Sequence, residues 1–232
     1  LPYTTISEAV ADAAPGDTLQ LAATTFVERV DLSMPLTLRG AANGATLIDV
    51  TQDIGWGITI GSDHVTVENL TVLAGGDNPH FAIHSEPGIT GVTIEDVAVY
   101  DSNRSCIDLN GLTGPDLNMV RNVTVVGSAI GFGLALSTCD QVLVENVYSA
   151  DNGFGDIAIM ASNYYDQEIS NITISGALNL GGPQALGGGG IVVQLDAATL
   201  PVGIGPGFAL NIQADGFEQV IEAPGELTGC IV

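Results

Sequence analysis

The segment Val67-Glu68-Asn69-Leu70 consists of an aliphatic residue, a spacer, an Asn and a second aliphatic residue. The pattern returns as Ile94-Glu95-Asp96-Val97, Val120-Arg121-Asn122-Val123, Val144-Glu145-Asn146-Val147 and Ile169-Ser170-Asn171-Ile172. The first residues of successive copies are 27, 26, 24 and 25 positions apart. Such a period, in segments rich in strand-forming residues, is typical of stacked repeats in which each copy forms one coil.

Short alternating segments surround each copy, as in Val65-Thr66-Val67 and Leu70-Thr71-Val72. A third alternating segment occurs in each coil: Ile58-Thr59-Ile60, Phe81-Ala82-Ile83, Ile107-Asp108-Leu109, Leu134-Ala135-Leu136, Ile157-Ala158-Ile159 and Ile191-Val192-Val193. Alternation places the flanking aliphatic residues inward and the middle residue outward. Three short strands per coil, each stacked on its counterpart, predict an all-β parallel β-helix.

The N-terminal segment predicts a short helix that covers the open end of the stack. Thr5 and Glu8 fit a capping box, Ile6 and Val10 lie on one apolar helical face, and Pro15-Gly16 ends the helix. We expect one domain, 1–232, with a strand and capping helix in 1–16, coils in 17–195, and a closing or association segment in 196–232.

The repeated Asn or Asp has a structural role in this interpretation. Asn tolerates the left-handed backbone of a tight bend, and stacked amides bond to one another. We therefore expect one inward-facing ladder of Asn69, Asp96, Asn122, Asn146 and Asn171. The preceding residues face outward and form a charge column: Arg39, Glu68, Glu95, Arg121, Glu145 and Ser170.

The chain has 232 residues, a net charge of −23, 27 acidic residues and four bases, all of them Arg. This balance disfavours nucleic acid, anionic membranes and acidic glycans as partners. No apolar run reaches the about 18 residues of a membrane-spanning helix, so we expect no membrane insertion.

The three cysteines, Cys106, Cys139 and Cys230, leave one thiol unpaired if two join. Buried thiols, one disulfide, and pairing of Cys230 between chains all stay open as interpretations. The chain begins with Leu1, which we interpret as processing after secretion or as a chosen boundary. An extracellular or cell-surface location is therefore expected.

The opening of the chain resembles right-handed parallel β-helix proteins of the pectate-lyase-like superfamily. The resemblance rests on Thr5 to Val10, Pro15-Gly16-Asp17-Thr18 and Pro35-Leu36-Thr37-Leu38-Arg39-Gly40, and extends over roughly residues 4 to 195. It implies a right-handed, single-stranded coil. The superfamily includes polysaccharide lyases, esterases, hydrolases and epimerases, phage tailspikes, and non-catalytic surface proteins.

The resemblance implies an active-site groove over the third-segment face. We expect one outward column of Thr59, Ala82, Asp108, Ala135, Ala158 and Val192, and a second of Gly61, His84, Asn110, Ser137, Met160 and Gln194. His84 and Asp108 are the candidate catalytic pair, because a carboxylate beside an imidazole can perform acid–base chemistry. The candidate binding residues are His80, Asn110, Asp101 and Arg104. A metal site of two His and an Asp, or a merely polar rim, are the alternatives.

Calcium is the one candidate cofactor, because Asp77, Asp101 and Asp151 occupy similar places in their coils and could supply oxygen ligands. Solvated turn residues are the alternative. Pectate lyases use a basic residue to abstract the proton; this chain has no Lys, and Arg104 is its candidate loop Arg.

Three functions compete. The first is a secreted non-catalytic β-helix, structural, adhesive or glycan-binding, that self-associates through its ends. The second is a polysaccharide-active lyase, hydrolase or epimerase with a minimal site near His84 and Asp108. The third is a tailspike-like receptor-binding protein. The expected partners are a polysaccharide or copies of the chain itself, as a homo-oligomer or filament.

Overall fold

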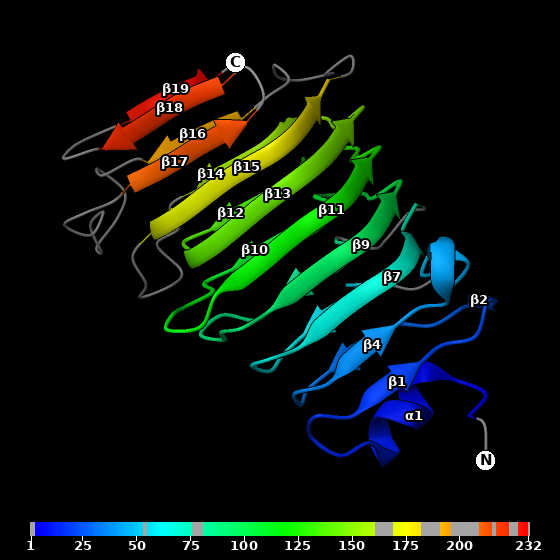
Figure 1. Cartoon of the computed structure of the whole chain (residues 1–232). Coiled ribbons are helices and arrows are strands. Elements are labelled where there is room, and N and C mark those ends of the chain that lie inside the picture. Colours follow the sequence, from blue (N-terminus) through cyan, green and yellow to red (C-terminus); the bar gives the residue numbers. More distant parts are fainter. Residues whose placement is uncertain are drawn as a thin grey trace.

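The chain winds into a parallel β-solenoid of about five turns, seen in a computed structural model that describes residues 3–52, 55–75, 81–160, 169–181, 191–195, 209–214, 217–222 and 227–231. About 51% of the chain is strand. Two sheets, here called sheet A and sheet B, run along the stack, and a short helix lies at the N-terminal end (Figure 1). The predicted parallel β-helix architecture is confirmed.

Both sheets receive strands from successive coils, and the first two coils give sheet A two short strands each where later coils give one long strand. Sheet A contains β1 (Thr18–Gln20), β2 (Thr25–Phe26), β4 (Thr37–Arg39), β5 (Leu47–Asp49), β7 (Thr66–Leu73), β9 (Thr93–Tyr100), β11 (Asn118–Val126), β13 (Asp140–Ala150), β15 (Ser170–Leu180), β17 (Ala209–Ala214) and β18 (Phe217–Glu222). Sheet B contains β3 (Val30–Leu32), β6 (Ile58–Ile60), β8 (Ile83–Ser85), β10 (Ile107–Asn110), β12 (Phe132–Ser137), β14 (Gly155–Met160), β16 (Ile191–Leu195) and β19 (Leu227–Ile231). Neighbours pair in parallel, except that β18 and β19 pair antiparallel with β17 and β16.

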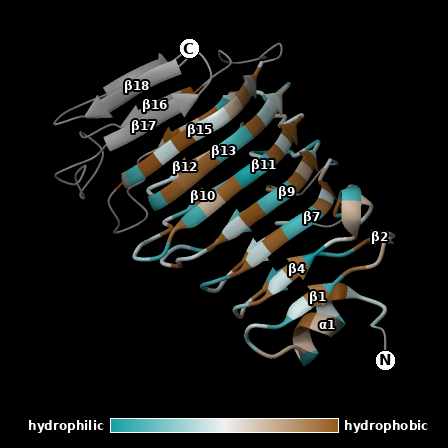
Figure 2. Cartoon of the chain, in the orientation of Figure 1, coloured by the Kyte–Doolittle hydropathy of each residue, from teal (hydrophilic) through white to brown (hydrophobic). Residues whose placement is uncertain are grey.

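The core is a continuous column of aliphatic side chains between the sheets. Hydrophobic and hydrophilic residues alternate along the sheet A strands (Figure 2). Residues such as Leu70 and Val97 on β7 and β9, and Ile83 and Ile107 on β8 and β10, are fully buried. Each such side chain contributes about 1.5–3 kcal/mol through its burial. Stacking therefore supplies the stability that a single coil lacks.

Helix α1 (Ile6–Asp12) covers the first coil, as the sequence predicts. Thr5 is its N-cap, and the Thr5 side chain accepts a hydrogen bond from the Glu8 backbone N–H at 3.2 Å. The Glu28 carboxylate accepts from the N–H groups of Ile6 and Ser7, at 2.7 and 3.0 Å. These contacts anchor the helix, whose Ile6 and Val10 side chains pack into the core.

The ladder residues bend single continuous strands instead of separating two strands. Asn69, Asp96, Asn122 and Asn146 have φ between 53° and 56°, the left-handed conformation that the sequence predicts. Asn122 Nδ2 donates to Asp96 Oδ1, and Asn146 Nδ2 donates to Asn122 Oδ1, both at 3.0 Å. Contrary to expectation, the ladder faces outward, because Asp96 and Asn122 are exposed.

Asn171 does not belong to this ladder. Strand β15 pairs Ser170 with Asp140 and Ile172 with Val142, which places Asn171 in an earlier column. Asn171 Nδ2 donates to Asp140 Oδ1 at 2.8 Å. The register between β13 and β15 shifts between Glu145 and Val147. At this shift the Ala177 backbone N–H donates to Asn146 Oδ1 at 2.9 Å.

The charge column is present on the outer face of sheet A. Register aligns Arg39 with Glu68, Glu68 with Glu95, and Arg121 with both Glu95 and Glu145. Arg39 pairs with Glu68, and Arg121 Nη2 lies 2.6 Å from Glu95 Oε1. The residue aligned with Glu145 is Ser175, not Ser170, because of the register of β15.

Candidate functional site

The outer face of sheet B brings three polar side chains together. Register aligns Thr59 with His84 and His84 with Asp108, and this column continues through Ala135 and Ala158. We expected His84 in the neighbouring column, with Ala82 in its place. The expectation was wrong by two residues, because β8 begins at Ile83 and puts Ser85, not an aliphatic residue, at its second inward position.

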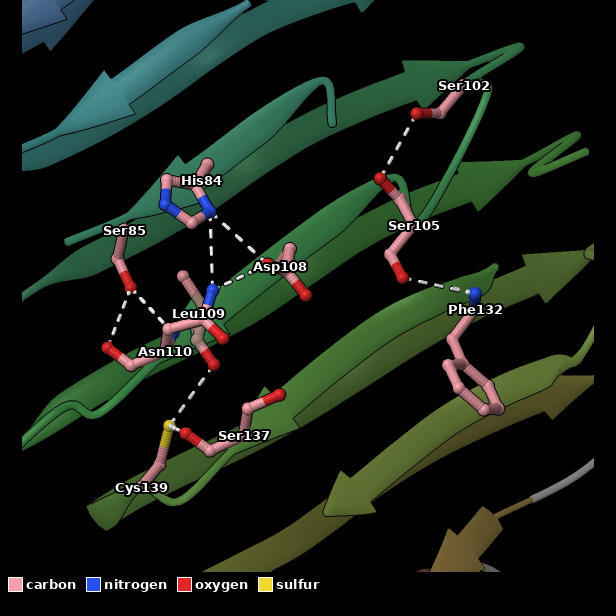
Figure 3. Close-up of polar contacts among 10 residues, drawn as sticks. All are labelled: His84, Ser85, Ser102, Ser105, Asp108, Leu109, Asn110, Phe132, Ser137 and Cys139. Atoms are coloured by element: carbon pink, nitrogen blue, oxygen red, sulfur yellow. Dashed lines mark hydrogen bonds and ion pairs between the residues drawn. The ribbon is translucent and has the colours of Figure 1, made fainter. Parts of the chain in front are cut away.

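Ser85 is fully buried and its hydroxyl bonds to the backbone of the next coil. The Asn110 backbone N–H donates to Ser85 Oγ at 2.8 Å. This hydrogen bond satisfies the hydroxyl where other coils place Ile60 or Leu109. It also ties β8 to β10 directly beneath the polar cluster (Figure 3).

His84, Asp108 and Asn110 form one hydrogen-bonded cluster (Figure 3). His84 Nδ1 lies 3.2 Å from Asp108 Oδ2, and Asn110 Nδ2 donates to the same oxygen at 2.5 Å. The three residues are only 5–6% exposed. The structure therefore brings together both candidate catalytic residues and one candidate binding residue.

The carboxylate fixes the tautomer of His84. Asn110 Nδ2 also lies 3.2 Å from His84 Nδ1, but an amide NH₂ and an N–H cannot donate to each other. Because Asp108 is the stronger acceptor, we assign the Nδ1 proton to the bond with Asp108. Nε2 then carries a lone pair, and no hydrogen bond to it is found in the described part of the chain.

Two aromatic rings border His84. Its ring centroid lies 3.9 Å from that of Trp56 and 5.5 Å from that of Phe81. Trp56 and Phe81 each precede the first inward Ile of their strand by two residues, so they occupy equivalent places in adjacent coils. Arg29 Nε donates to the Trp56 carbonyl at 2.9 Å and helps to hold this segment.

An apolar patch continues the same face toward the C-terminal coils. Phe132, Ala135 and Ala158 form a cluster separate from the main core, with Met160 packed against it. The Phe132 and Phe154 rings meet edge to face with centroids 5.8 Å apart, and Phe154 is 40% exposed. Aromatic rings thus border the face on both sides of the polar cluster.

Arg104 lies at the same border. Its Cζ is 5.5 Å from the Phe81 ring centroid, and its side chain is exposed. Arg39 and Arg121 form ion pairs with glutamates on sheet A. Arg104 and Arg29, which bonds the Trp56 carbonyl, are therefore the basic residues that border the His84 cluster in the described part of the chain.

Two of the three calcium ligands expected from the sequence, Asp101 and Asp151, do not lie together. Asp101 and Asp151 both have left-handed turns, with φ of 57° and 55°, but they lie two coils apart with Gly127 between them. Asp77 and His80 fall outside the described residues. Among the described residues, no group of three or more His, Cys, Asp or Glu side chains could hold a metal ion.

Cys106 and Cys139 are free, buried thiols. Burial raises the pKa of each to about 12, chiefly by desolvation. Cys106 Sγ points to Val126 O at 3.8 Å, and Cys139 Sγ to Leu109 O at 3.4 Å. A thiol that stays protonated is a poor nucleophile and a poor metal ligand, so neither cysteine suits a reactive site.

Comparisons with known proteins find no match to any protein-family model, curated protein or solved structure. In the part of the chain that the structure describes, no helix is long and apolar enough to cross a membrane.

Proposed function

We propose that the protein is a secreted, non-catalytic β-solenoid that binds a neutral glycan chain along the outer face of sheet B. The observation that carries this proposal is the packing of Trp56 and Phe81 around His84, beside Asp108 and Asn110. Apolar rings and fixed hydrogen-bonding groups share one face there.

A sugar ring offers an apolar C–H face and a rim of hydroxyl groups. Trp and Phe rings contact the apolar face, and carboxylate and amide groups bond the hydroxyls. Because Asp108 is already fixed by His84 and Asn110, little side-chain order is lost when a ligand binds. Polar groups on a rigid sheet are typical of a preformed site.

Charge favours a neutral glycan over an acidic one. The chain carries a net charge of −23, and the cluster contributes the Asp108 carboxylate. Two basic residues border the cluster in the described part of the chain: Arg104 lies over the Phe81 ring, and Arg29 bonds the Trp56 carbonyl. A polyuronate would meet repulsion over most of the surface.

Membership of the pectate-lyase-like superfamily is part of the proposal. The capping helix and the turn residues support it, and so does the location of the polar cluster on an outer strand face. An extracellular location fits a glycan-binding solenoid, and it belongs to the same proposal.

Affinity electrophoresis in gels that contain cellulose derivatives, mixed-linkage glucan or galactomannan tests the proposal. We expect retardation of the wild type by at least one neutral polymer, and loss of retardation in Trp56→Ala and Phe81→Ala. Tyr148→Ala removes an exposed aromatic ring from sheet A and is the control. Equal retardation of all four proteins, or of none, contradicts the proposal.

An acid–base enzyme is the second candidate, and the orientation of His84 by Asp108 favours it. Nδ1 bonded to a carboxylate leaves Nε2 as a general base. No second carboxylate hydrogen-bonds within this cluster in the described residues, so a paired-carboxylate hydrolase is disfavoured. Release of reducing or unsaturated sugars from the same polymers, abolished by His84→Asn, would favour this candidate over a binding role.

A further inference from the structure

We infer that the outer face of sheet A carries a separate binding site, a groove centred on Asp96 that takes a neutral sugar residue. This site shares no residue with the His84 cluster on sheet B, and the inference does not depend on the function proposed for that cluster. It rests on a break in the Asn ladder and on the cavity beside the break.

The groove has a volume of about 500 Å³. This lies within the range of about 300–1,000 Å³ that is usual for small-molecule sites. Its lining includes ladder residues Asn69, Asp96 and Asn122, the outward column Thr71, Ala98 and Thr124, the ring of Tyr100, and the turn at Asn43 and Gly44. Register places Ala98 between the two threonines, and its small side chain leaves the floor hollow.

The ladder runs in one direction and stops at Asp96. Asn146 donates to Asn122, and Asn122 donates to Asp96 Oδ1. Asp96 has no side-chain amide, so it cannot donate the next hydrogen bond of the ladder to Asn69, the following residue in the column. Within the described part of the chain, neither Asp96 Oδ2 nor the Asn69 amide has a hydrogen-bond partner.

An Asn in place of Asp96 would suit the fold better. Asn adopts the left-handed conformation, which has φ of 53° here, and would also extend the ladder. A carboxylate there adds a negative charge next to Glu95 and one coil from Glu68. The bond from Asn122 would also be available to an Asn, so it does not explain the carboxylate, and a residue that breaks a local rule in this way indicates a functional position.

Arg121 supplies only part of that compensation, because it interacts with Asp96 through charge but is bonded to Glu95. Its guanidinium bonds Glu95 at 2.6 Å, and its Nε has no partner. No ion pair joins it to Asp96 among the described residues. Asp96 therefore lines the groove with a carboxylate that no ion pair holds in the described part of the chain.

The free groups match the chemistry of a neutral sugar. The Asp96 carboxylate accepts bonds from hydroxyls, the Asn69 amide both donates and accepts, and the Thr124 hydroxyl does the same. Tyr100, which is 38% exposed, supplies a ring at the end of β9 for the apolar face of the sugar. An anion would be repelled by Asp96, and a metal ion would find a single carboxylate there.

The variant Asp96→Asn gives the decisive test, because it should stabilise the fold while it removes the ligand contact. We expect a higher urea midpoint of unfolding than in the wild type, since the introduced amide can donate to Asn69. Binding of neutral oligosaccharides at the groove should weaken at least tenfold. A merely structural role for Asp96 predicts no loss of binding.

Binding is followed by NMR with cellotriose, maltotriose and mannotriose as probes. The side-chain amide signals of Asn69 and Asn122 report on the groove, and the single indole signal of Trp56 reports on sheet B. We expect at least one probe to shift the amide signals in the wild type and to do so far less in Asp96→Asn and Tyr100→Ala. The Trp56 response should be the same in all three proteins.

Three outcomes would overturn the inference. In the first, no probe shifts the amide signals of the wild type. In the second, Asp96→Asn binds as the wild type does. In the third, spermine gives the Asp96-dependent shifts while the sugars give none, which would identify a cation site. Loss of the Trp56 response alone would count against the sheet B proposal and leave this inference standing.

Discussion

The outer faces of the two sheets come from the same coils but differ in how their polar residues are arranged. On sheet A, charges and amides recur in register and bond to one another, as in the pairs Arg121 with Glu95 and Asn146 with Asn122. On sheet B, His84 and Asp108 interrupt a column that also contains Asp31, Thr59, Ala135 and Ala158, and Asn110 lies in the next outward column. Polar groups that repeat in register bond to one another and stabilise the fold. A position where the repeat is broken is therefore a candidate site.

Asp96 extends this lesson to sheet A. It is the ladder member that cannot pass its hydrogen bond to the next coil, and it lies where the face is hollowed. Both candidate sites thus lie where the chemistry of a column changes, at one coil on sheet A and at two adjacent coils on sheet B.

The largest expected effect concerns the core at the ends of the sheet B strands, where Cys106 and Cys139 lie. Their pKa values are raised to about 12 from 9.0, so the folded state keeps two protons that the unfolded chain loses above pH 9. The stabilisation of the folded state by these protonated thiols is complete below pH 9 and is lost between pH 9 and 12. Each thiol then costs up to about 1.4 kcal/mol per pH unit.

Urea unfolding between pH 8 and 11 measures this loss. The double variant Cys106→Ala/Cys139→Ala should be less stable at pH 8, but its stability should fall less steeply above pH 9. If the free energy of unfolding falls equally steeply with pH in both proteins, the thiols are not shielded from water as the structure indicates.

Asn122→Ala should destabilise the sheet A ladder by about 2–3 kcal/mol, because it removes two hydrogen bonds and puts Ala, which tolerates the left-handed conformation less well than Asn, at φ 53°. Asn122→Gly keeps the left-handed turn, so its smaller loss isolates the hydrogen bonds. Chemical denaturation gives both values. If the two variants lose the same stability, the left-handed turn is not what the Asn supplies.

Asp108→Ala should cost about 1–3 kcal/mol of stability, because His84 and Asn110 are buried and lose their shared acceptor. Retardation by a neutral glycan should be lost as well. Asp108→Asn, which keeps the size of the side chain, is the matched variant. Unchanged binding in both variants would assign the cluster to the fold alone.

Arg121→Gln should have the smallest effect, at most about 1 kcal/mol, because exposed ion pairs contribute little. Hydrogen bonding to Glu95 raises the pKa of the Arg121 guanidinium, so it stays charged at any accessible pH. The stability difference should shrink in 1 M NaCl. A salt-independent loss would assign Arg121 a packing role.

Periodicity was enough to predict the coils, the left-handed bends and the capped first turn, because each depends on local sequence. It misplaced Asn171 because the phrase around it matches the repeat by chance, while the register of β15 is set by pairing with β13. It misplaced His84 because a buried Ser85 takes the inward position that the pattern assigned to an aliphatic residue.

The sequence named His84 and Asp108 as a pair but placed them in different columns. Their alignment depends on the register of β8, which the sequence pattern did not give. Trp56 and Phe81 were missed as site residues. Their signal was present, because each lies two residues before an inward Ile and the two are one coil apart. That signal becomes visible only when the strand register is known. The outward direction of the ladder was likewise beyond a pattern that treats every bend as inward.

The fluorescence of Trp56, the single tryptophan of the chain, tests the central claim most directly. Its ring lies against His84, so a glycan on the outer face of sheet B must alter its surroundings. We predict a saturable change on titration with a neutral oligosaccharide in the wild type, and none in Asp108→Ala. A wild-type signal that stays flat with every neutral oligosaccharide, or an equal change in both proteins, would contradict the claim.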